Sequence, residues 1–528
     1  MCGIFGVIST SIITDYKSLY NPVQEQTEDN ESIYYQSKHT ILMFHPKCSN
    51  HRDKYFKYSV KKDPESFKKD PESFKKNKKF LVLCNGKIYD YIYLKNTYDV
   101  SDKSYIYPLF KELHTLFYKL NIDMIGEEYS IAIIECVNYI PVHIYLSTDT
   151  SSTRSLLYII DEKNGIIAFS SLLKDLTNIQ NINKKEIKRL PGGHILDITL
   201  ENDNGLFLKI KSVLFSCYLD NININALLPS ISLTDKNIIK PVIINLLVDS
   251  IKKRCYENKE IGCYLDGGID TSFVAVIANK YMNGKLKTFS IGMEGDEDLK
   301  YSKLVSEHIQ SEHTEIIFTK EEGLEVLKDV INTIETFDVI TIRDGIYQYL
   351  LAKWISKNTS VDIMLLSEGS DELQNGFLKD NKPMHEYTMK MIDNIYLYNG
   401  LRADRCFSRF GLETRFPYLD YSLVEYYKTI HPSLKCPDRN TVVEKYLFRT
   451  AVEEQNILSN DIIYRIKKRM STSIKWISND DDTENNKYRN HCCPYDNESL
   501  FYREIFEEIF GEEVCEIIPY YFNELLLC

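Results

Sequence analysis

The feature that most limits the fold is an alternation of strand-like and helix-like segments that begins near residue 235. Apolar runs such as "EIGCYL", "LKTFSIGM", "TEIIFT" and "VDIMLL" each precede a longer helix-like stretch, and the sequence is helix-rich from there to about residue 460. Strands that alternate with helices pair in parallel, and the helices cover both faces of the sheet. Residues 235–528 are therefore predicted to form a doubly wound α/β domain.

The first 205 residues have a different pattern of apolar residues, with many strand-like runs and little helix. Five runs have the length and apolar character of strands: "HTILMF", "KFLVLC", "EYSIAIIEC", "VHIYLS" and "GIIAFSS". One helix-like segment, residues 105–120, interrupts them. Many strands with few helices indicate a two-layer β-rich domain, so we expect one domain at 1–205, a second at 235–528 and a boundary near 205–235.

Composition excludes several classes of protein. The net charge of −12 argues against nucleic-acid binding, which needs a basic footprint. No run reaches the ~18 apolar residues of a membrane-spanning helix. The 13 cysteines include no CxxC pair, and the first base, Lys17, comes too late for a secretory signal. We therefore expect a cytoplasmic protein with reduced thiols and no zinc site.

The most specific motif is "CYLDGGIDTSF", residues 263–273. A strand end, a Gly267-Gly268 turn and a helix start place backbone N–H groups where they can cradle an anion, and Thr271 and Ser272 add hydroxyl donors. The loop is too short for a Walker motif. It fits a turn that holds the pyrophosphate of ATP and leaves the α-phosphate open to attack. An ordinary strand–helix turn is the alternative.

A second acidic loop, "LLSEGSDE" at residues 365–372, ends another strand of the same region. Open α/β sheets bind ligands at the carboxyl ends of their strands. Asp270 and Asp371 are therefore candidates to share Mg²⁺, and Glu368 is a candidate general base. Two bases are candidates to neutralise phosphate charge, although each could equally be a surface base: Lys467 and Arg343.

The chain opens with "MCGIFGV". If Met1 is removed, Cys2 carries a free α-amine whose reference pKa of about 7.7–8.0 lets it serve as the base for the thiol. Cys2 is therefore a candidate nucleophile, and these residues alone do not decide the matter. A cysteine preceding a buried first strand is the alternative.

The chain resembles the glutamine-hydrolysing asparagine synthetases of the B type over essentially its whole length. The resemblance rests on ordered motifs: "MCGIFGV", "NGKIYD", "SDKS", "DGGIDTS", "SIGMEGDEDL", "IETFDVITIR", "SEGSDE", "RFGLETRFPYLD", "VEKYLFR" and "FYREIFEEIF". It implies an N-terminal-nucleophile amidotransferase with an αββα sandwich, joined to an ATP-pyrophosphatase domain. The implied reaction makes asparagine from aspartate, through β-aspartyl-AMP, with ammonia from glutamine.

The resemblance also implies roles for single residues. Cys2 attacks the glutamine amide, Asn85 and Gly86 form the oxyanion hole, and Lys467 and Glu368 act in the synthetase half. The glutamine contacts are Lys47, Asn85, Lys87 and Asp102. The ATP contacts are Leu265, Asp266, Gly267, Gly268, Asp270, Thr271, Ser272, Ile291, Leu366 and Ser367. Asp270 and Asp371 hold Mg²⁺, and Arg343 and Glu372 contact aspartate. A homodimer is expected from the resemblance alone.

The sequence departs from the family at several of these places. Lys47, Lys87 and Leu172 stand where the family has arginine, glutamate and glutamate, which weakens the expected affinity for glutamine. Asp266 and Leu366 each replace a serine at the nucleotide contacts. Two alternatives therefore stay open beside the leading hypothesis. One is an ammonia-dependent synthetase with an impaired glutaminase, and the other is a non-catalytic relative that binds aspartate or nucleotide.

Overall fold

The computed structural model describes residues 3–9, 33–36, 40–45, 55–59, 78–87, 128–138, 140–203, 207–217, 233–255, 259–282, 285–374, 384–435, 444–466, 476 and 497–520. The chain divides into two compact units, Met1–Asn223 and Ile224–Cys528. Among the described helices, none combines the length and apolar character that crossing a bilayer requires.

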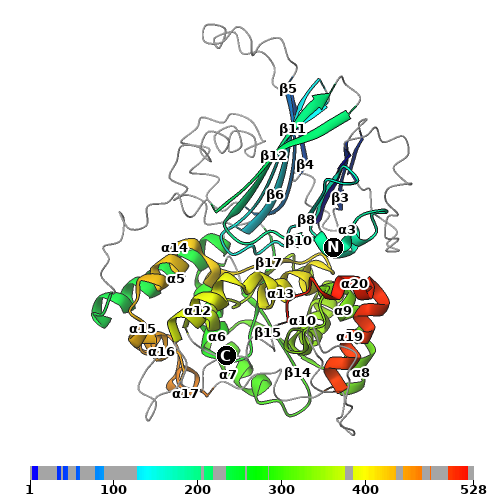
Figure 1. The fold of residues 1–528 in the computed structure, drawn as a ribbon. Helices are drawn as coiled ribbons and strands as arrows, with labels where there is room; N and C mark the ends of the chain where they lie inside the picture. The colour runs from blue at the N-terminus through cyan, green and yellow to red at the C-terminus, as the bar shows by residue number, and fades with distance from the viewer. Residues whose placement is uncertain are drawn as a thin grey trace. The chain divides into compact units, whose positions relative to one another are not determined.

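The first unit contains two antiparallel sheets of six described strands each (Figure 1). One sheet has the order β10-β8-β9-β1-β3-β2 and the other β12-β11-β7-β6-β5-β4. The strands of the first sheet are β1 (Gly3–Ser9), β2 (Ile33–Gln36), β3 (Thr40–His45), β8 (Leu157–Asp161), β9 (Ile166–Ser170) and β10 (Lys188–Arg189). Those of the second are β4 (Tyr55–Ser59), β5 (Lys78–Lys87), β6 (Glu128–Val137), β7 (Ile140–Thr148), β11 (His194–Asp203) and β12 (Phe207–Cys217).

Alternate residues of both sheets form one apolar core. Ile4 and Ile8 of β1 pack in the same cluster as Leu81 and Leu83 of β5, with residues of β6, β7, β9 and β11. Successive side chains of a strand point to opposite faces, so one face of each sheet is buried against the other. A short helix, α3 (Leu173–Thr177), follows β9.

The strands predicted in this half are present as β3, β5, β6, β7 and β9. The prediction omitted other strands, including β11 and β12. Polar residues break the apolar run of β11, among them Asp197 and Glu201, and β12 leaves Leu214 and Phe215 exposed. The predicted helix at 105–120 lies outside the described residues.

The second unit is built on a parallel sheet of five described strands with the order β15-β14-β13-β16-β17. They are β13 (Ile261–Tyr264), β14 (Lys287–Gly292), β15 (Glu312–Ile317), β16 (Ile363–Leu365) and β17 (Glu413–Arg415). The strand order reverses between β13 and β16, which makes their carboxyl ends the switch point where doubly wound sheets bind ligands. The predicted combination of a β-rich first half and a parallel α/β second half is confirmed, and the structure shows in addition that the sheets of the first half are antiparallel.

The helices of this unit fall into two groups (Figure 1). Helices α5 (Lys236–Cys255), α6 (Ile269–Tyr281), α7 (Glu297–Ile309), α14 (Tyr421–Thr429) and α16 (Tyr446–Glu453) contact one another. The second contacting group is α9 (Leu327–Ile334), α10 (Val339–Asn358), α13 (Asn399–Ser408) and α19 (Asn497–Phe510). Shorter helices include α8 (Lys320–Glu325), α11 (Ser370–Gln374), α12 (Met384–Asp393), α15 (Pro432–Lys435), α17 (Asn460–Ile463) and α20 (Glu512–Cys515).

Strand β17 corrects the prediction that the sequence is helical from β16 to about residue 460. It has only three residues, which is too short to give a periodic signal. Its pairing with β16 adds a fifth strand and fixes the far side of the loop that follows β16, because the amide of Leu366 donates to the carbonyl of Arg415 (3.0 Å).

Candidate functional site

Two glycine turns frame the site at the switch point. Gly267 follows β13 with φ +72°, and Gly369 follows β16 with φ +94°. Glycine adopts these angles without the cost that a Cβ brings. A Cβ on Gly267 would overlap Tyr301, and one on Gly369 would overlap Leu419. Both turns therefore depend on glycine for conformation and for space.

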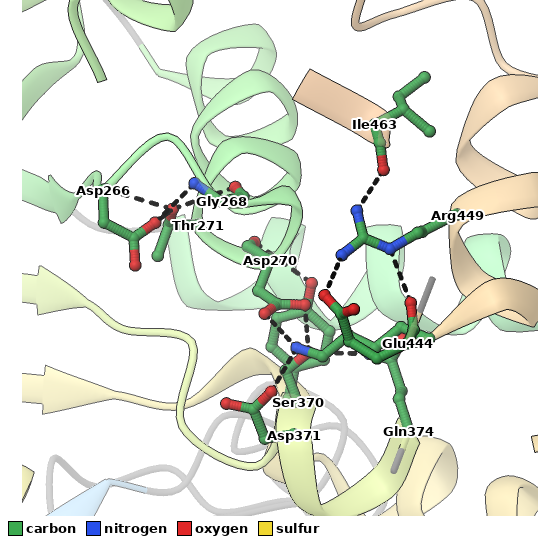
Figure 2. A network of polar contacts seen from close by, with 12 residues as sticks. Asp266, Gly268, Asp270, Thr271, Ser370, Asp371, Gln374, Glu444, Arg449 and Ile463 are labelled. Atoms are coloured by element: carbon green, nitrogen blue, oxygen red, sulfur yellow. Dashed lines mark hydrogen bonds and ion pairs between the residues drawn. The ribbon is translucent and has the colours of Figure 1, made fainter. Parts of the chain in front are cut away.

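The first turn is closed by its own aspartate, as Figure 2 shows. Oδ1 of Asp266 accepts hydrogen bonds from the amide of Gly268 (2.8 Å) and from the hydroxyl of Thr271 (2.5 Å). The amide of Asp266 in turn donates to Oγ1 of Thr271 (3.3 Å). The loop and the first turn of α6 are thereby tied to one carboxylate oxygen.

Asp270 and Asp371 lie on either side of one ammonium group (Figure 2). Nζ of Lys445 forms an ion pair with Oδ2 of Asp270 and another with Oδ1 of Asp371 (2.6 Å). The other oxygen of Asp270 accepts a hydrogen bond from Ser370 (2.6 Å). The Lys445 side chain is fully buried. The two predicted metal ligands therefore converge on a common cation.

The backbone that carries Lys445 is anchored separately. Lys445 stands at the start of α16 with φ +61°. The guanidinium of Arg449 donates to the carbonyl and carboxylate of Glu444 (2.7 and 2.6 Å) and to the carbonyl of Ile463 (Figure 2). Arg449 thus joins the start of α16 to the end of α17, which fixes where Lys445 enters the site.

Arg465, just after α17, reaches the first turn. It donates to the carbonyl oxygen of Asp266 (2.8 Å), pairs with the carboxylate of Asp298 and lies over the ring of Tyr301 (4.2 Å to the centroid). Burial, and secondly the negative charge of Asp266, raise the pKa of Asp298 to about 6 despite the opposing charge of Arg465. Asp266 and Asp298 therefore place two carboxyl groups beside this turn, and Arg465 pairs with the second.

Glu368 follows β16 and is largely buried. It accepts a hydrogen bond from Gln348 of α10 (2.6 Å), and Arg402 of α13 lies 3.5 Å from the same oxygen. Burial raises the pKa of Glu368 above its usual range, while the charge of Arg402 and the Gln348 bond oppose the rise. A carboxylate with a raised pKa is a better proton acceptor, which suits a general base.

Arg402 holds this part of the site together. Its guanidinium donates to Gln348 (3.2 Å), to Asp344 (3.2 Å) and to Asn399 (2.7 Å). The amide of Asn399 donates in turn to Glu372 (2.5 Å). Predicted residues Glu368 and Glu372 are thus linked through a base that the sequence prediction did not name.

The remaining predicted nucleotide contacts lie along the same strand ends. Leu265 continues β13 and donates its amide to the carbonyl of Phe289 (2.8 Å). Ile291 lies in β14, and Leu366 and Ser367 lead from β16 into its turn. Ser272 is fully buried in α6, and its hydroxyl has no hydrogen-bond partner within the described part of the chain.

Arg343 is committed elsewhere in the structure. Its Nε and NH2 groups bind both oxygens of Glu498 in α19 (3.1 and 2.5 Å). Glu498 is fully buried and also accepts from the hydroxyl of Tyr502 (2.6 Å). The guanidinium N–H groups that would bind a substrate carboxylate are therefore already bound to Glu498. The role of Arg343 in binding aspartate stays a prediction.

In the first unit, Asn85 and Gly86 lie near the end of β5. Asn85 is buried and pairs with Ser130, and Gly86 has φ +132°. A Cβ on Gly86 would overlap the carbonyl of Glu128, so only glycine fits. Lys87 ends the strand opposite Glu128.

Four predicted residues lie outside the described part of the chain: Cys2, Lys47, Asp102 and Lys467. Three bases of the site were not assigned from the sequence, namely Lys445, Arg402 and Arg465. Lys445 and Arg465 stand inside the motifs "VEKYLFR" and "YRIKKR", so their positions carried a signal. Their partners, however, lie about 70 to 200 residues away and no spacing rule reveals them.

The carboxylates suit magnesium. Mg²⁺ prefers oxygen ligands and is usually held by one or two carboxylates together with phosphate oxygens and water. Asp270 and Asp371 supply two carboxylates that already share one cation. The described residues contain no cluster of three or more His, Cys, Asp or Glu that would make a protein-only cage.

Comparison with known proteins identifies the family. The model of the family described as asparagine synthase matches residues 243–381 and 377–516. A protein of Gallus gallus described as "Asparagine synthetase [glutamine-hydrolyzing]" is 32% identical over 399 residues, covering 69% of this chain and 70% of that protein. The Homo sapiens protein of the same description is 32% identical over 357 residues, covering 64% and 62%.

Among solved structures, a glutamine phosphoribosylpyrophosphate amidotransferase from B. subtilis matches 53% of this chain and 64% of its own at 12% identity, with a TM-score of 0.26, which is too low to support a conclusion. The family model covers more than half of the chain, and the Gallus gallus relative exceeds 30% identity over more than two thirds of its length. The chain therefore belongs to the asparagine synthase family.

Proposed function

We propose that this chain is a glutamine-dependent asparagine synthetase that activates aspartate with ATP and then replaces AMP by ammonia. One observation carries the proposal. Asp270 and Asp371 converge on the ammonium group of Lys445 at the switch point of the parallel sheet, beside the largely buried Glu368, whose pKa is raised. The names of the relatives support the same activity.

In the first step a side-chain oxygen of aspartate attacks the α-phosphorus of ATP. The bond from that phosphorus to the bridging oxygen breaks, and pyrophosphate leaves with the electron pair. The backbone amides of Gly267 and Gly268 would bind the leaving phosphates. Asp270 and Asp371 would hold the Mg²⁺ that enters with ATP as part of the substrate, and Lys467 would neutralise charge on the α-phosphate.

In the second step the lone pair of ammonia attacks the activated carbonyl carbon. The amine that forms carries an extra proton, and Glu368 would accept it as AMP departs. Arg343 and Glu372 are the proposed contacts of the aspartate. Because Arg343 already binds Glu498, its contact requires either a shared or a rearranged guanidinium.

The ammonia would come from the first unit. The thiol of Cys2, deprotonated by its own α-amine, would attack the glutamine amide. The side chain of Asn85 and the amide of Gly86 would stabilise the tetrahedral oxyanion, while Asp102, Lys47 and Lys87 contact the amino-acid end of glutamine. We also propose a cytoplasmic homodimer; the six cysteines whose side chains the structure describes are buried free thiols, which suits a reducing compartment.

The test follows the nitrogen. The full chain is incubated with ATP, Mg²⁺, aspartate and either amide-¹⁵N glutamine or ¹⁵N ammonium, and labelled asparagine, AMP and pyrophosphate are measured. We expect labelled asparagine from both donors, and Cys2→Ala should abolish only the glutamine reaction. Asp270→Asn should lower both rates at least a hundredfold. Labelled product from ammonium alone would favour the ammonia-dependent alternative, and no AMP from either donor would contradict the proposal.

A further inference from the structure

The turn that would receive the leaving phosphates of ATP contains a negative charge of its own. Oδ1 of Asp266 accepts the amide hydrogen of Gly268 and the hydroxyl hydrogen of Thr271. These are an N–H of a glycine turn and a hydroxyl of a helix start, the two kinds of donor that bind a phosphate oxygen. In the free protein the Asp266 carboxylate thus holds donors that a phosphate would use.

Among the described residues, the base that binds this turn does not pair with the Asp266 carboxylate. That base is Arg465, which donates to the backbone carbonyl of Asp266 and to the carboxylate of Asp298. Within the described residues no ion pair to the Asp266 side chain is formed. Burial is the larger cause of the raised pKa of Asp298, and the charge of Asp266 is the second.

A phosphate that approaches the turn therefore meets two costs. It must displace the carboxylate from Gly268 and Thr271, and it must approach the like charge of that carboxylate. A serine, which is the residue that the family has at this position, brings no charge, and its hydroxyl oxygen would hold these donors less strongly than a carboxylate does. The effect falls on the ground-state binding of ATP and on the binding of pyrophosphate alike, because both present phosphate oxygens to the same donors.

We propose that the side chain of Asp266 is an internal competitor for the leaving phosphates, and that it sets a weakened affinity of this enzyme for ATP and for pyrophosphate. This inference rests on the proposed function of the turn. The converse arrangement, in which Asp266 turns outward and becomes a third ligand of magnesium, predicts the opposite sign for its removal and is therefore separable by experiment.

The test is a calorimetric titration of the full chain with Mg·ATP and, separately, with Mg·pyrophosphate. The wild type is compared with Asp266→Ser and with Asp266→Asn, which keeps an acceptor for Gly268 but lacks the charge. Asp235→Ser is the matched control, because Asp235 likewise accepts the amide of a residue at the start of a helix, Asn237 of α5 (2.9 Å), and is exposed.

We expect Asp266→Ser to tighten both ligands at least tenfold, Asp266→Asn to tighten them by a smaller factor, and Asp235→Ser to leave them within twofold of the wild type. Equal affinities in all four proteins would overturn the inference. Weaker binding by both Asp266 variants would overturn it in favour of a magnesium ligand, and absence of pyrophosphate binding in every protein would overturn it as well.

The outcome is independent of asparagine formation. If AMP and asparagine form but the affinities do not change, the inference fails and the proposed function stands. If pyrophosphate binds more tightly to Asp266→Ser but no protein forms AMP, the turn is an anion site with a built-in competitor and the proposed function fails. Thermal melting of each variant shows whether it is folded.

Discussion

At the scale of single residues, the site is governed by buried bases that join carboxylates from distant parts of the chain. Lys445 lies between Asp270 and Asp371, and Arg402 lies between Asp344 and Glu368. A buried charge without its partner is expensive, because it has lost its water and gained nothing in return. Removing either base should therefore change the ionisation of its partner carboxylates as well as the stability of the fold.

Lys445→Met should destabilise the second unit when magnesium is absent. Without the ammonium group, the carboxylates of Asp270 and Asp371 face each other uncompensated, so we expect the free energy of unfolding to fall by about 3–5 kcal/mol. Added Mg²⁺ should restore part of the loss. Guanidinium denaturation with and without Mg²⁺ measures both effects. Lys328→Met, which breaks an exposed pair with Glu508, is the control and should cost no more than about 1 kcal/mol.

Arg402→Met should change the pH dependence of the ammonia reaction. The Arg402 charge opposes the raised pKa of Glu368, so its loss should raise that pKa further. A general base works only when ionised, and the acid limb of kcat should therefore move to higher pH. Arg405→Met is the control, since it breaks a comparable buried pair with Glu335 (3.2 Å). A pH profile that is the same in both variants would show that Arg402 acts only on stability.

At the scale of elements, the site depends on two sharp turns at adjacent strand ends. Both turns contain a glycine with positive φ that is also crowded by a neighbouring element. In the turn after β16, a Cβ on Gly369 would overlap Leu419, and Gly369 immediately precedes α11, which carries Asp371. Glycine is needed at position 369 for two reasons, the positive φ and the lack of space for a Cβ, and the two can be measured separately.

Gly369→Ala should be more destabilising than Gly511→Ala. The two glycines have nearly the same φ, +94° and +92°, but a Cβ at Gly511 meets nothing within 4 Å. A side chain at such a positive φ costs about 1–3 kcal/mol, and overpacking adds about 1–3 kcal/mol at Gly369 alone. Thermal or chemical denaturation of both variants measures the difference. Equal losses of stability in the two variants would mean that the Leu419 side chain moves aside at little cost.

At the scale of the whole molecule, the chain combines an antiparallel β sandwich with a parallel α/β unit, and each has a carboxyl group whose pKa is raised to about 6, mainly by loss of water around it. In the first unit this is Asp149, which accepts hydrogen bonds from the amides of Tyr129 and Ser151 and from the hydroxyl of Thr153. Burial raises its pKa to about 6 although these donors lower it. In the second unit it is Asp298.

Asp149 should make the first unit less stable as the pH rises. Because its folded pKa lies above the unfolded value of 3.8, the folded state binds the proton more tightly. That advantage is lost between about pH 4 and pH 6, and it amounts to at most about 3 kcal/mol. Comparing the pH dependence of unfolding of the wild type with that of Asp149→Asn isolates it. The wild type should lose stability relative to the variant as the pH rises; parallel curves would contradict this.

The sequence predicts the architecture better than the site. Strand–helix alternation and the glycine turns were sufficient to place Asp266, Asp270, Glu368 and Asp371 at strand ends, because these features are local. The contact between Lys445 and Asp270 spans 175 residues, and the pairing of Arg343 with Glu498 spans 155. Such pairings depend on how the helices pack against one another in the folded protein, and no local sequence pattern shows this. Strand β17 was missed because three residues are too few to give a periodic pattern of apolar and polar side chains.

The buried ammonium between Asp270 and Asp371 has a consequence for assembly. A counter-ion that is covalently part of the chain is present at unit stoichiometry from the moment of synthesis, whatever the ionic composition of the cell. The acidic strand ends can therefore come together before any dissolved ion or nucleotide arrives, and the loss of either during turnover leaves the scaffold intact.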